Sequence, residues 1–177
     1  MLQTKDSKLN DLLVRNQIMF EDFVEEAYNC LMVSIFEIIA NELNDQEYKR
    51  YTKHRLINGS NKVLTTQKIV YELTRCRLNV DECQIIYRYI YAYLTKKNQR
   101  NVYADTIKQK LLIRQNHKCN ICKTNIKSIN SELDHIVPWT YVGDELGIEN
   151  LQMLCIECNR KKSKNSAYNL KMFLINK

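Results

Sequence analysis

The sequence predicts a mainly α-helical protein, in which an N-terminal helical domain precedes a small zinc-stabilised module. The chain of 177 residues contains 3 glycines and 1 proline, too few for the many tight turns of a β-sandwich or barrel. Apolar residues recur at three- and four-residue steps over most of the first 115 residues, which is the helical period. Beyond them the period stops and cysteines occur in pairs. We therefore expect one domain over residues 1–105 and another over residues 106–177.

The longest helical pattern covers residues 7–43 and is apolar on both sides between Phe20 and Ile39. Such a helix is buried in its own fold or against a second copy of the chain. Further helices are expected over residues 65–78, 81–97 and 102–115, after an Asn-Gly turn in residues 56–61. Asn79 and Glu82 have the spacing of a capping box. The two helices that meet there form either a DNA-reading helix-turn-helix or a plain hairpin.

Charge is distributed unevenly along the chain. The 27 Lys and Arg against 20 Asp and Glu give a net charge of +7, but residues 1–50 carry 5 basic and 10 acidic side chains. Residues 51–110 carry 12 basic and 4 acidic ones, and the remainder 10 and 6. This pattern favours a polyanionic partner, namely nucleic acid, along the last two thirds of the chain.

The most apolar segment is 11 residues long, at positions 30–40, and contains Glu37. A membrane span needs about 20 apolar residues, and the first residues do not have the basic and apolar runs of a secretory signal. We therefore expect a cytoplasmic protein. In that compartment seven cysteines favour thiols or metal ligands over disulfides.

Two cysteine pairs predict a structural zinc site. Each pair is separated by two residues, and 32 residues lie between the pairs. Such a spacing lets a short knuckle aim both sulfurs at one point, and two knuckles complete the tetrahedron that Zn²⁺ prefers. Four thiolates leave no open coordination position, so this ion should stabilise the module and take no part in chemistry. The predicted ligands are Cys119, Cys122, Cys155 and Cys158.

The segment between the knuckles carries an Asp-His pair in the motif LDHIVPW. Alternating residues predict strands over residues 131–137 and 151–154, and a helix is expected from about Cys158. The first knuckle, LDHIVPW, the glycine-containing loop and ENLQMLCIECNRKK together resemble the HNH endonuclease family with its ββα-metal finger. This resemblance covers about residues 115–164. The first 105 residues carry no family resemblance that we can name.

The resemblance implies a role for each matching residue. His135 is the candidate general base, because an imidazole titrates near neutral pH. Asp134 matches the carboxylate that holds the catalytic metal, and Asn159 matches a second metal ligand. Their oxygen atoms suit Mg²⁺ or Mn²⁺. With only one carboxylate, metal affinity should be weak until substrate phosphate and water complete the coordination shell.

Asn150 matches an asparagine expected to bond backbone across the loop and so to orient His135. The basic side chains after the second knuckle are expected to contact phosphate: Arg160, Lys161 and Lys162. Trp139 and Tyr141 either pack the loop or stack on a sugar.

These expectations describe a metal-dependent endonuclease that hydrolyses DNA and leaves 5′-phosphate and 3′-hydroxyl ends. A restriction or defence role is expected, with double-stranded DNA as partner. One site per chain suggests a homodimer through the N-terminal helices when both strands are cut. The alternatives are an RNA-cleaving nuclease or toxin, an inactive zinc-dependent nucleic-acid-binding protein, and a redox-sensing cysteine protein.

Overall fold

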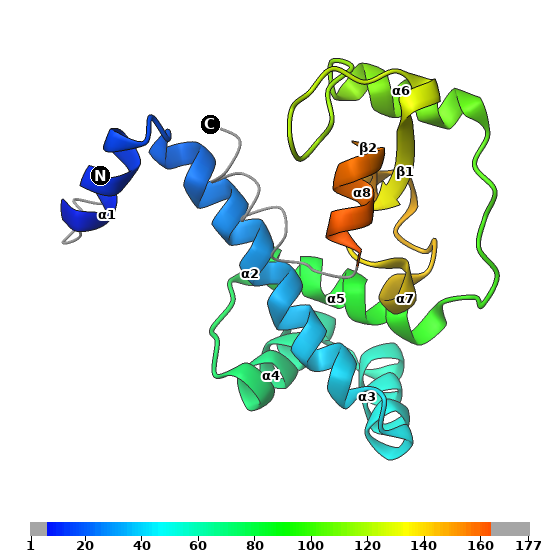
Figure 1. The fold of residues 1–177 in the computed structure, drawn as a ribbon. Helices are drawn as coiled ribbons and strands as arrows, with labels where there is room; N and C mark the ends of the chain where they lie inside the picture. The colour runs from blue at the N-terminus through cyan, green and yellow to red at the C-terminus, as the bar shows by residue number, and fades with distance from the viewer. Residues whose placement is uncertain (1–6, 164–177) are drawn as a thin grey trace.

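The computed structural model describes residues 7–163, and the predicted fold class is confirmed: helices predominate and a small two-stranded sheet lies near the C-terminus (Figure 1). The first part of the chain contains helices alone. They are α1 (Ser7–Arg15), α2 (Phe20–Glu42), α3 (Gln46–Asn58), α4 (Lys62–Thr74) and α5 (Val80–Thr95).

Side-chain caps explain where three of these helices begin. Asp45 accepts a hydrogen bond from the backbone N–H of Tyr48 at 2.8 Å and starts α3. Asn61 caps α4 in the same way. At α5 the predicted capping box is confirmed, because Asn79 and Glu82 each accept from the other's backbone N–H, at 2.9 and 2.7 Å. Each cap satisfies an amide that would otherwise lack a partner in the first helical turn.

The structure differs from the sequence prediction in several details of this part. The helical pattern of residues 7–43 is two helices, because Gln17 adopts a φ of 56° between α1 and α2. Helix α3 was not predicted at all. It buries only Thr52 and Leu56, so its apolar period is weak, and the expected turn shrinks to the residues after Asn58.

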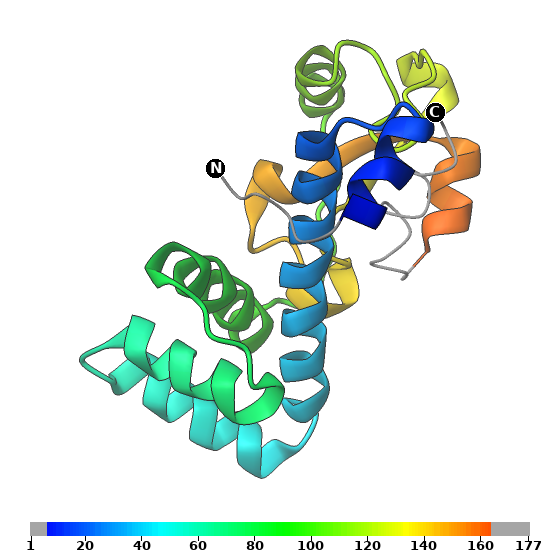
Figure 2. The same ribbon diagram turned by 90° about the vertical axis from the view of Figure 1, so that its left-hand side faces the viewer.

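A first hydrophobic core, which we call the helical core, lies between α2, α4 and α5 (Figure 2). Helix α2 contributes one face to it, and Phe36 and Ile39 are fully buried there. The same helix also exposes Val24 and Leu31. Helix α5 is packed against α2 and α4 on one side and α7 on another.

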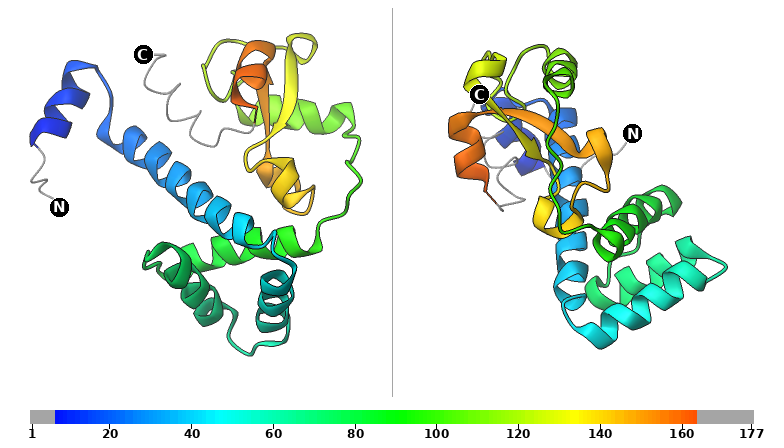
Figure 3. Two further views of the ribbon diagram at one scale, coloured as in Figure 1. Left: turned by 60° about the horizontal axis from the view of Figure 1, so that its bottom comes forward. Right: turned by 90° about the vertical axis from the view of Figure 1, so that its right-hand side faces the viewer.

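The C-terminal module, residues 105–163, has the expected strand, strand and helix order. It consists of α6 (Asp105–Arg114), a 3₁₀ turn (Ser128–Asn130), β1 (Ser131–His135), α7 (Trp139–Val142), a second 3₁₀ turn (Gly147–Asn150), β2 (Leu151–Cys155) and α8 (Ile156–Lys162). The two strands are antiparallel and pair His135 with Leu151. Helix α8 packs on the sheet (Figure 3).

The module has a core of its own and also contributes residues to the helical core. A second cluster, the module core, contains Leu111, Leu151 and Met153 together with Cys119 and Cys158. The loop after β1 instead enters the helical core, where Val137 and Val142 are buried. In addition, the Tyr141 ring meets Phe36 edge-on at 6.0 Å.

Between residues 7 and 163, none of the helices combines the length and the apolar character that crossing a membrane requires.

Candidate active site and zinc cluster

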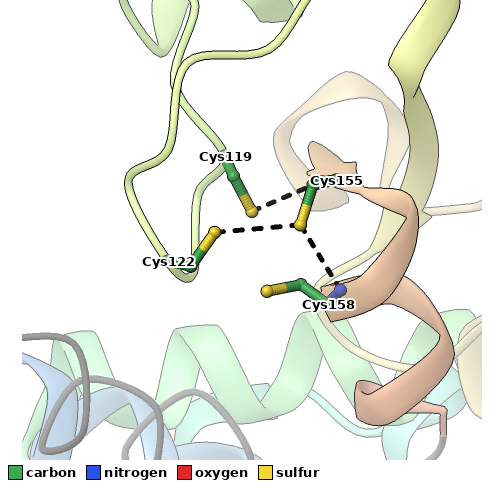
Figure 4. A group of neighbouring side chains, drawn as sticks. All are labelled: Cys119, Cys122, Cys155 and Cys158. Carbon is green, nitrogen blue, oxygen red and sulfur yellow. Dashed lines mark hydrogen bonds between the residues drawn. The ribbon is translucent and has the colours of Figure 1, made fainter.

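The four predicted zinc cysteines converge on one point (Figure 4). Their sulfur atoms all lie within 4.8 Å of one another. Cys119 and Cys122 come from the loop after α6, whereas Cys155 and Cys158 come from the end of β2 and the first turn of α8. Backbone N–H groups also point at the sulfurs, from Cys155 to Cys119 at 3.3 Å and from Cys158 to Cys155 at 3.4 Å.

The electrostatics of this cluster favour a bound cation. Burial, and then the neighbouring sulfurs, raise the pKa of the Cys158 thiol. Burial also tends to raise the pKa of Cys122, but the hydrogen bonds with Thr124 and with the other cysteines outweigh it and lower the pKa to about 7. Four thiolates this close repel one another, and a divalent cation removes that repulsion. The residues therefore fit the tetrahedral sulfur site that the spacing predicts.

His135, the predicted general base, ends β1 and is 3% exposed. Its Nε2 lies 2.9 Å from a carboxylate oxygen of Asp144, whose side chain is 7% exposed. Within the described chain, its Nδ1 is buried and has no hydrogen-bond partner. Thus Nε2 is hydrogen-bonded to Asp144, whereas Nδ1 makes no hydrogen bond within the described structure.

Asp144 receives four hydrogen bonds. One carboxylate oxygen accepts from the Tyr103 hydroxyl at 2.6 Å and lies against His135. The other accepts from the backbone N–H of Asn101 at 2.8 Å and from the Trp139 indole at 3.2 Å. Burial alone would raise the pKa of Asp144, but these donors outweigh it and lower the pKa to about 2.

The glycine before Asp144 makes this placement possible. Gly143 has a φ of +60°, a conformation that side-chain-bearing residues rarely adopt. A Cβ on it would also approach the Cβ of Lys96 to 3.1 Å. The chain turns at Gly143, immediately after α7, and this turn brings the Asp144 carboxylate within hydrogen-bonding distance of His135.

The charge of Asp144 fixes the tautomer of His135. An ionised carboxylate only accepts hydrogen bonds, so the Nε2 that faces it must carry the hydrogen. The lone pair of a neutral ring then lies on Nδ1. Burial lowers the pKa of His135 and outweighs the opposing effect of Asp144, so the ring is neutral at neutral pH and can accept a proton.

Asp134 lies on the opposite face of β1 from His135. Its carboxylate accepts from Gln152 on β2 at 2.8 Å and pairs with Lys162 on α8 at 2.9 Å. Gln152 also binds Asn120 of the first knuckle at 2.7 Å. Side-chain hydrogen bonds therefore connect the first knuckle of the four-cysteine cluster with the predicted metal ligand.

Asn159 faces the same side of β1 but pairs with Glu132. Its amide nitrogen donates to the Glu132 carboxylate at 2.6 Å. Glu132 and Asp134 are two residues apart on one strand, and their partners Asn159 and Lys162 are three apart on α8. Three side chains with oxygen donors for a hard cation thus line the contact between β1 and α8.

Asn150 joins the two ends of the loop. Its side chain accepts from the backbone N–H of Val137 at 2.8 Å and donates to the carbonyl of Val137 at 3.0 Å. Its own carbonyl accepts from Ile136 at 2.8 Å. These bonds fix the backbone immediately after His135.

The three predicted phosphate contacts occupy different positions. Arg160 and Lys161 are exposed on α8, and Lys161 pairs with Glu157. Lys162 is 2% exposed, and its ammonium donates to the His135 carbonyl at 2.8 Å in addition to pairing with Asp134. Lys162 therefore differs from the expectation: it lies inside the module, where the charge of Asp134 draws it, and not on the outer face of α8.

Sequence reasoning did not find Asp144, Tyr103, Asn101 or Glu132. Glu132 could have been found, because strand alternation places it on the face of Asp134. Asp144 lies in a loop beside Glu145, and nothing in the sequence separates the two. Tyr103 and Asn101 come from the segment between α5 and α6, far from any motif. Trp139 contributes its indole N–H to this network, and Tyr141 packs on Phe36.

Comparison with known proteins places this module in a family. Residues 119–165 match the family model of the HNH endonuclease. A stretch of 59 residues, 33% of this chain, is 41% identical to the CRISPR-associated endonuclease Cas9 of Corynebacterium diphtheriae, and it covers 5% of that protein's length. No solved structure matches the chain significantly. The C-terminal module is thus an HNH endonuclease domain, as the resemblance predicted, and the similarity to Cas9 concerns a small part of each protein.

Proposed function

We propose that this protein is a metal-dependent endonuclease that hydrolyses DNA phosphodiester bonds at His135. The observation that carries the proposal is the state of that ring. A buried carboxylate holds Nε2, and Nδ1 keeps an unused lone pair. A histidine that is only structural would be expected to satisfy both nitrogens, because a buried polar atom without a partner is costly.

This mechanism requires one water molecule to reach Nδ1 of His135, which is buried in the free protein. Nδ1 then takes a proton from that water, and the resulting hydroxide attacks phosphorus. The bond from phosphorus to the 3′ oxygen breaks, which leaves a 5′-phosphate and a 3′-hydroxyl. Asp144 stabilises the imidazolium that forms, because its charge lies 2.9 Å from Nε2. Asn150 holds the backbone that presents the ring.

The residues between β1 and α8 fit a divalent cation. Asp134 and Asn159 would hold it, and Glu132 adds a further carboxylate at 2.6 Å from the Asn159 amide. Carboxylate and amide oxygens suit Mg²⁺ or Mn²⁺. When bound, such an ion stabilises the charge that develops on the phosphate and on the leaving oxygen. Lys162 already places one positive charge beside Asp134.

Zinc is proposed for the four-cysteine cluster, where it would hold the two knuckles together. The choice of DNA over RNA, and a defence role, are also part of the proposal. The similarity to a CRISPR-associated endonuclease supports the defence role.

The decisive experiment is cleavage of plasmid DNA by the purified protein with Mg²⁺ or Mn²⁺, with end mapping of the products. We expect His135→Ala to lower the rate by about 10²-fold to 10⁴-fold, the usual contribution of a general base. His117→Ala is the matched control, because His117 is exposed and outside the network. Equal cleavage by wild type and His135→Ala would remove His135 from the mechanism. Cleavage assays on RNA substrates under the same conditions decide whether DNA or RNA is the substrate.

A further inference from the structure

An exposed groove on the helical part carries unpaired positive charge. Residues 46–78, which include α3 and α4, contain 8 Lys and Arg but 2 Asp and Glu. Two shallow hollows lie along α4, with volumes of about 370 and 460 Å³. They share Lys68, so we treat them as one surface and call it the α4 groove. Its charged and aromatic residues are His54, Arg55, Lys68, Tyr71 and Arg77, with Arg75 beside them.

The residues that line the two hollows carry an excess of positive charge. No carboxylate is among the described residues that line either hollow. The ion pairs found between residues 7 and 163 involve other cations, such as Arg88 and Lys108. Lysines and arginines on a folded surface usually alternate with acidic groups. Glu72 is the one acidic side chain among residues 62–78 of the sequence, so the surface keeps an excess of positive charge, which favours an anionic partner.

The arginines are arranged around an exposed ring. Arg75 and Arg77 lie over Tyr71, at 5.6 and 5.9 Å from its centre, and the ring itself is 42% exposed. Stacking on an aromatic face orients a guanidinium while leaving its N–H groups free to bind phosphate. The α4 N-terminus, at Lys62, opens into the hollow that His54 and Arg55 line. Its dipole adds further positive potential there.

We propose that the α4 groove binds the phosphate backbone of double-stranded DNA, separately from the HNH site. A helix of 13 residues is about 20 Å long, which equals roughly six base-pair steps. Helix α5 lies between α4 and the C-terminal module and contacts both α4 and α7 (Figures 1 and 3). The groove would therefore tether DNA to the chain and raise its local concentration at the nuclease.

This inference rests on the proposed function, because the choice of DNA follows from it. The experiment measures binding of a labelled DNA duplex to the full chain by fluorescence anisotropy in EDTA, over a range of salt concentrations. The test variant is Lys68→Glu/Arg77→Glu. The matched control is Lys8→Glu/Arg15→Glu, which makes the same charge change on α1. Lys68→Gln/Arg77→Gln removes the charges without reversing them, and thermal melts verify that each variant is folded.

We expect the test variant to raise Kd at least tenfold at about 0.1 M salt and to reduce the slope of log K against log salt by about 2. The glutamine pair should change Kd in the same direction by less, and the control pair should stay close to wild type. Unchanged Kd and slope would overturn the inference, and so would an equal loss in the control pair. Preferential binding to duplex RNA or to phosphatidylserine vesicles would also overturn it.

The two proposals fail in different ways. Loss of binding in the test variant, together with no cleavage by wild type under any metal, removes the nuclease proposal and leaves the groove. Normal binding by the test variant, together with cleavage that depends on His135, removes the groove and leaves the nuclease.

Discussion

The pairing of His135 with Asp144 determines what the imidazole can do. Four donors surround one carboxylate, which keeps Asp144 ionised and the ring in a single tautomer. Asp144 raises the pKa of His135, whereas burial of the ring lowers it and disfavours the protonated form. The balance gives a ring that is neutral at neutral pH, with a counter-charge beside Nε2 for the imidazolium that the proposed mechanism forms.

We expect Asp144→Asn to lower kcat by on the order of 10²-fold, because an amide cannot supply that charge and can donate to Nε2. Tyr103→Phe should cost less, about three- to tenfold, because one of the four donors is lost. KM should change little in both variants. A ¹⁵N NMR spectrum of the His135 ring should show the Nε2–H tautomer in wild type and a mixture in Asp144→Asn.

The control for this prediction is Tyr93→Phe. Tyr93 is 7% exposed, and its hydroxyl bonds Asn44 at 2.9 Å inside the helical part. Its removal should destabilise the fold by about 1 kcal/mol, as should Tyr103→Phe. Only the Tyr103 variant should lose activity. Equal loss of kcat in both tyrosine variants would mean that stability, and not the placement of His135, explains the effect.

The pH dependence of cleavage follows from the lowered pKa of His135. A general base works in its neutral form, so the rate should rise with pH up to that pKa and then remain level. Since the ordinary pKa is 6.5, the midpoint should lie below 6.5. Asp144→Asn should move it lower still, because the carboxylate raises the pKa. A midpoint above 7 in the pH–kcat profile would contradict the proposed environment of the ring.

At the level of elements, one strand separates the predicted general base from the predicted metal ligands. Alternation along β1 sends His135 to one face, against Asp144, and sends Glu132 and Asp134 to the other, against α8. Helix α8 begins at the second knuckle, since Cys155 caps it and Cys158 lies in its first turn. The cysteine cluster therefore fixes the end of α8 that carries Asn159.

Zinc removal should unfold the C-terminal module and spare the helical core. We expect Cys155→Ser to lose the metal, measured by elemental analysis, and to lose one thermal transition while most helical circular dichroism remains. Cys76→Ser is the matched control, because Cys76 is half-buried and lies outside the cluster. Full zinc content in Cys155→Ser would show that the ion is not bound as proposed.

At the scale of the whole molecule, residues outside the family match contact the HNH domain. Tyr103 and Asn101 reach Asp144 from the segment between α5 and α6, and Val137 and Val142 are buried in the helical core. A movement of the helical part relative to the module would therefore change the position of Asp144 and its hydrogen bond to His135. The boundary at residue 105 and a homodimer through the N-terminal helices stay predictions.

The sequence alone determined the features that depend on local spacing. Two knuckles, an alternating strand, a capping box and the family motifs are all patterns within a few residues, and local geometry translates them directly into structure. They were sufficient to identify the module and its cysteine cluster and to select His135 as the candidate base. Helix α3 was not predicted, because it buries too few residues to produce a clear helical period of apolar side chains.

Only the tertiary structure decided which partners those residues meet. Asp144 could be selected over Glu145, and Lys162 separated from Arg160 and Lys161, because burial and long-range contacts distinguish side chains that look alike in sequence. The α4 groove likewise combines residues from two helices and the segment after them. Contacts of this kind arise from packing between distant segments, and no local pattern encodes them.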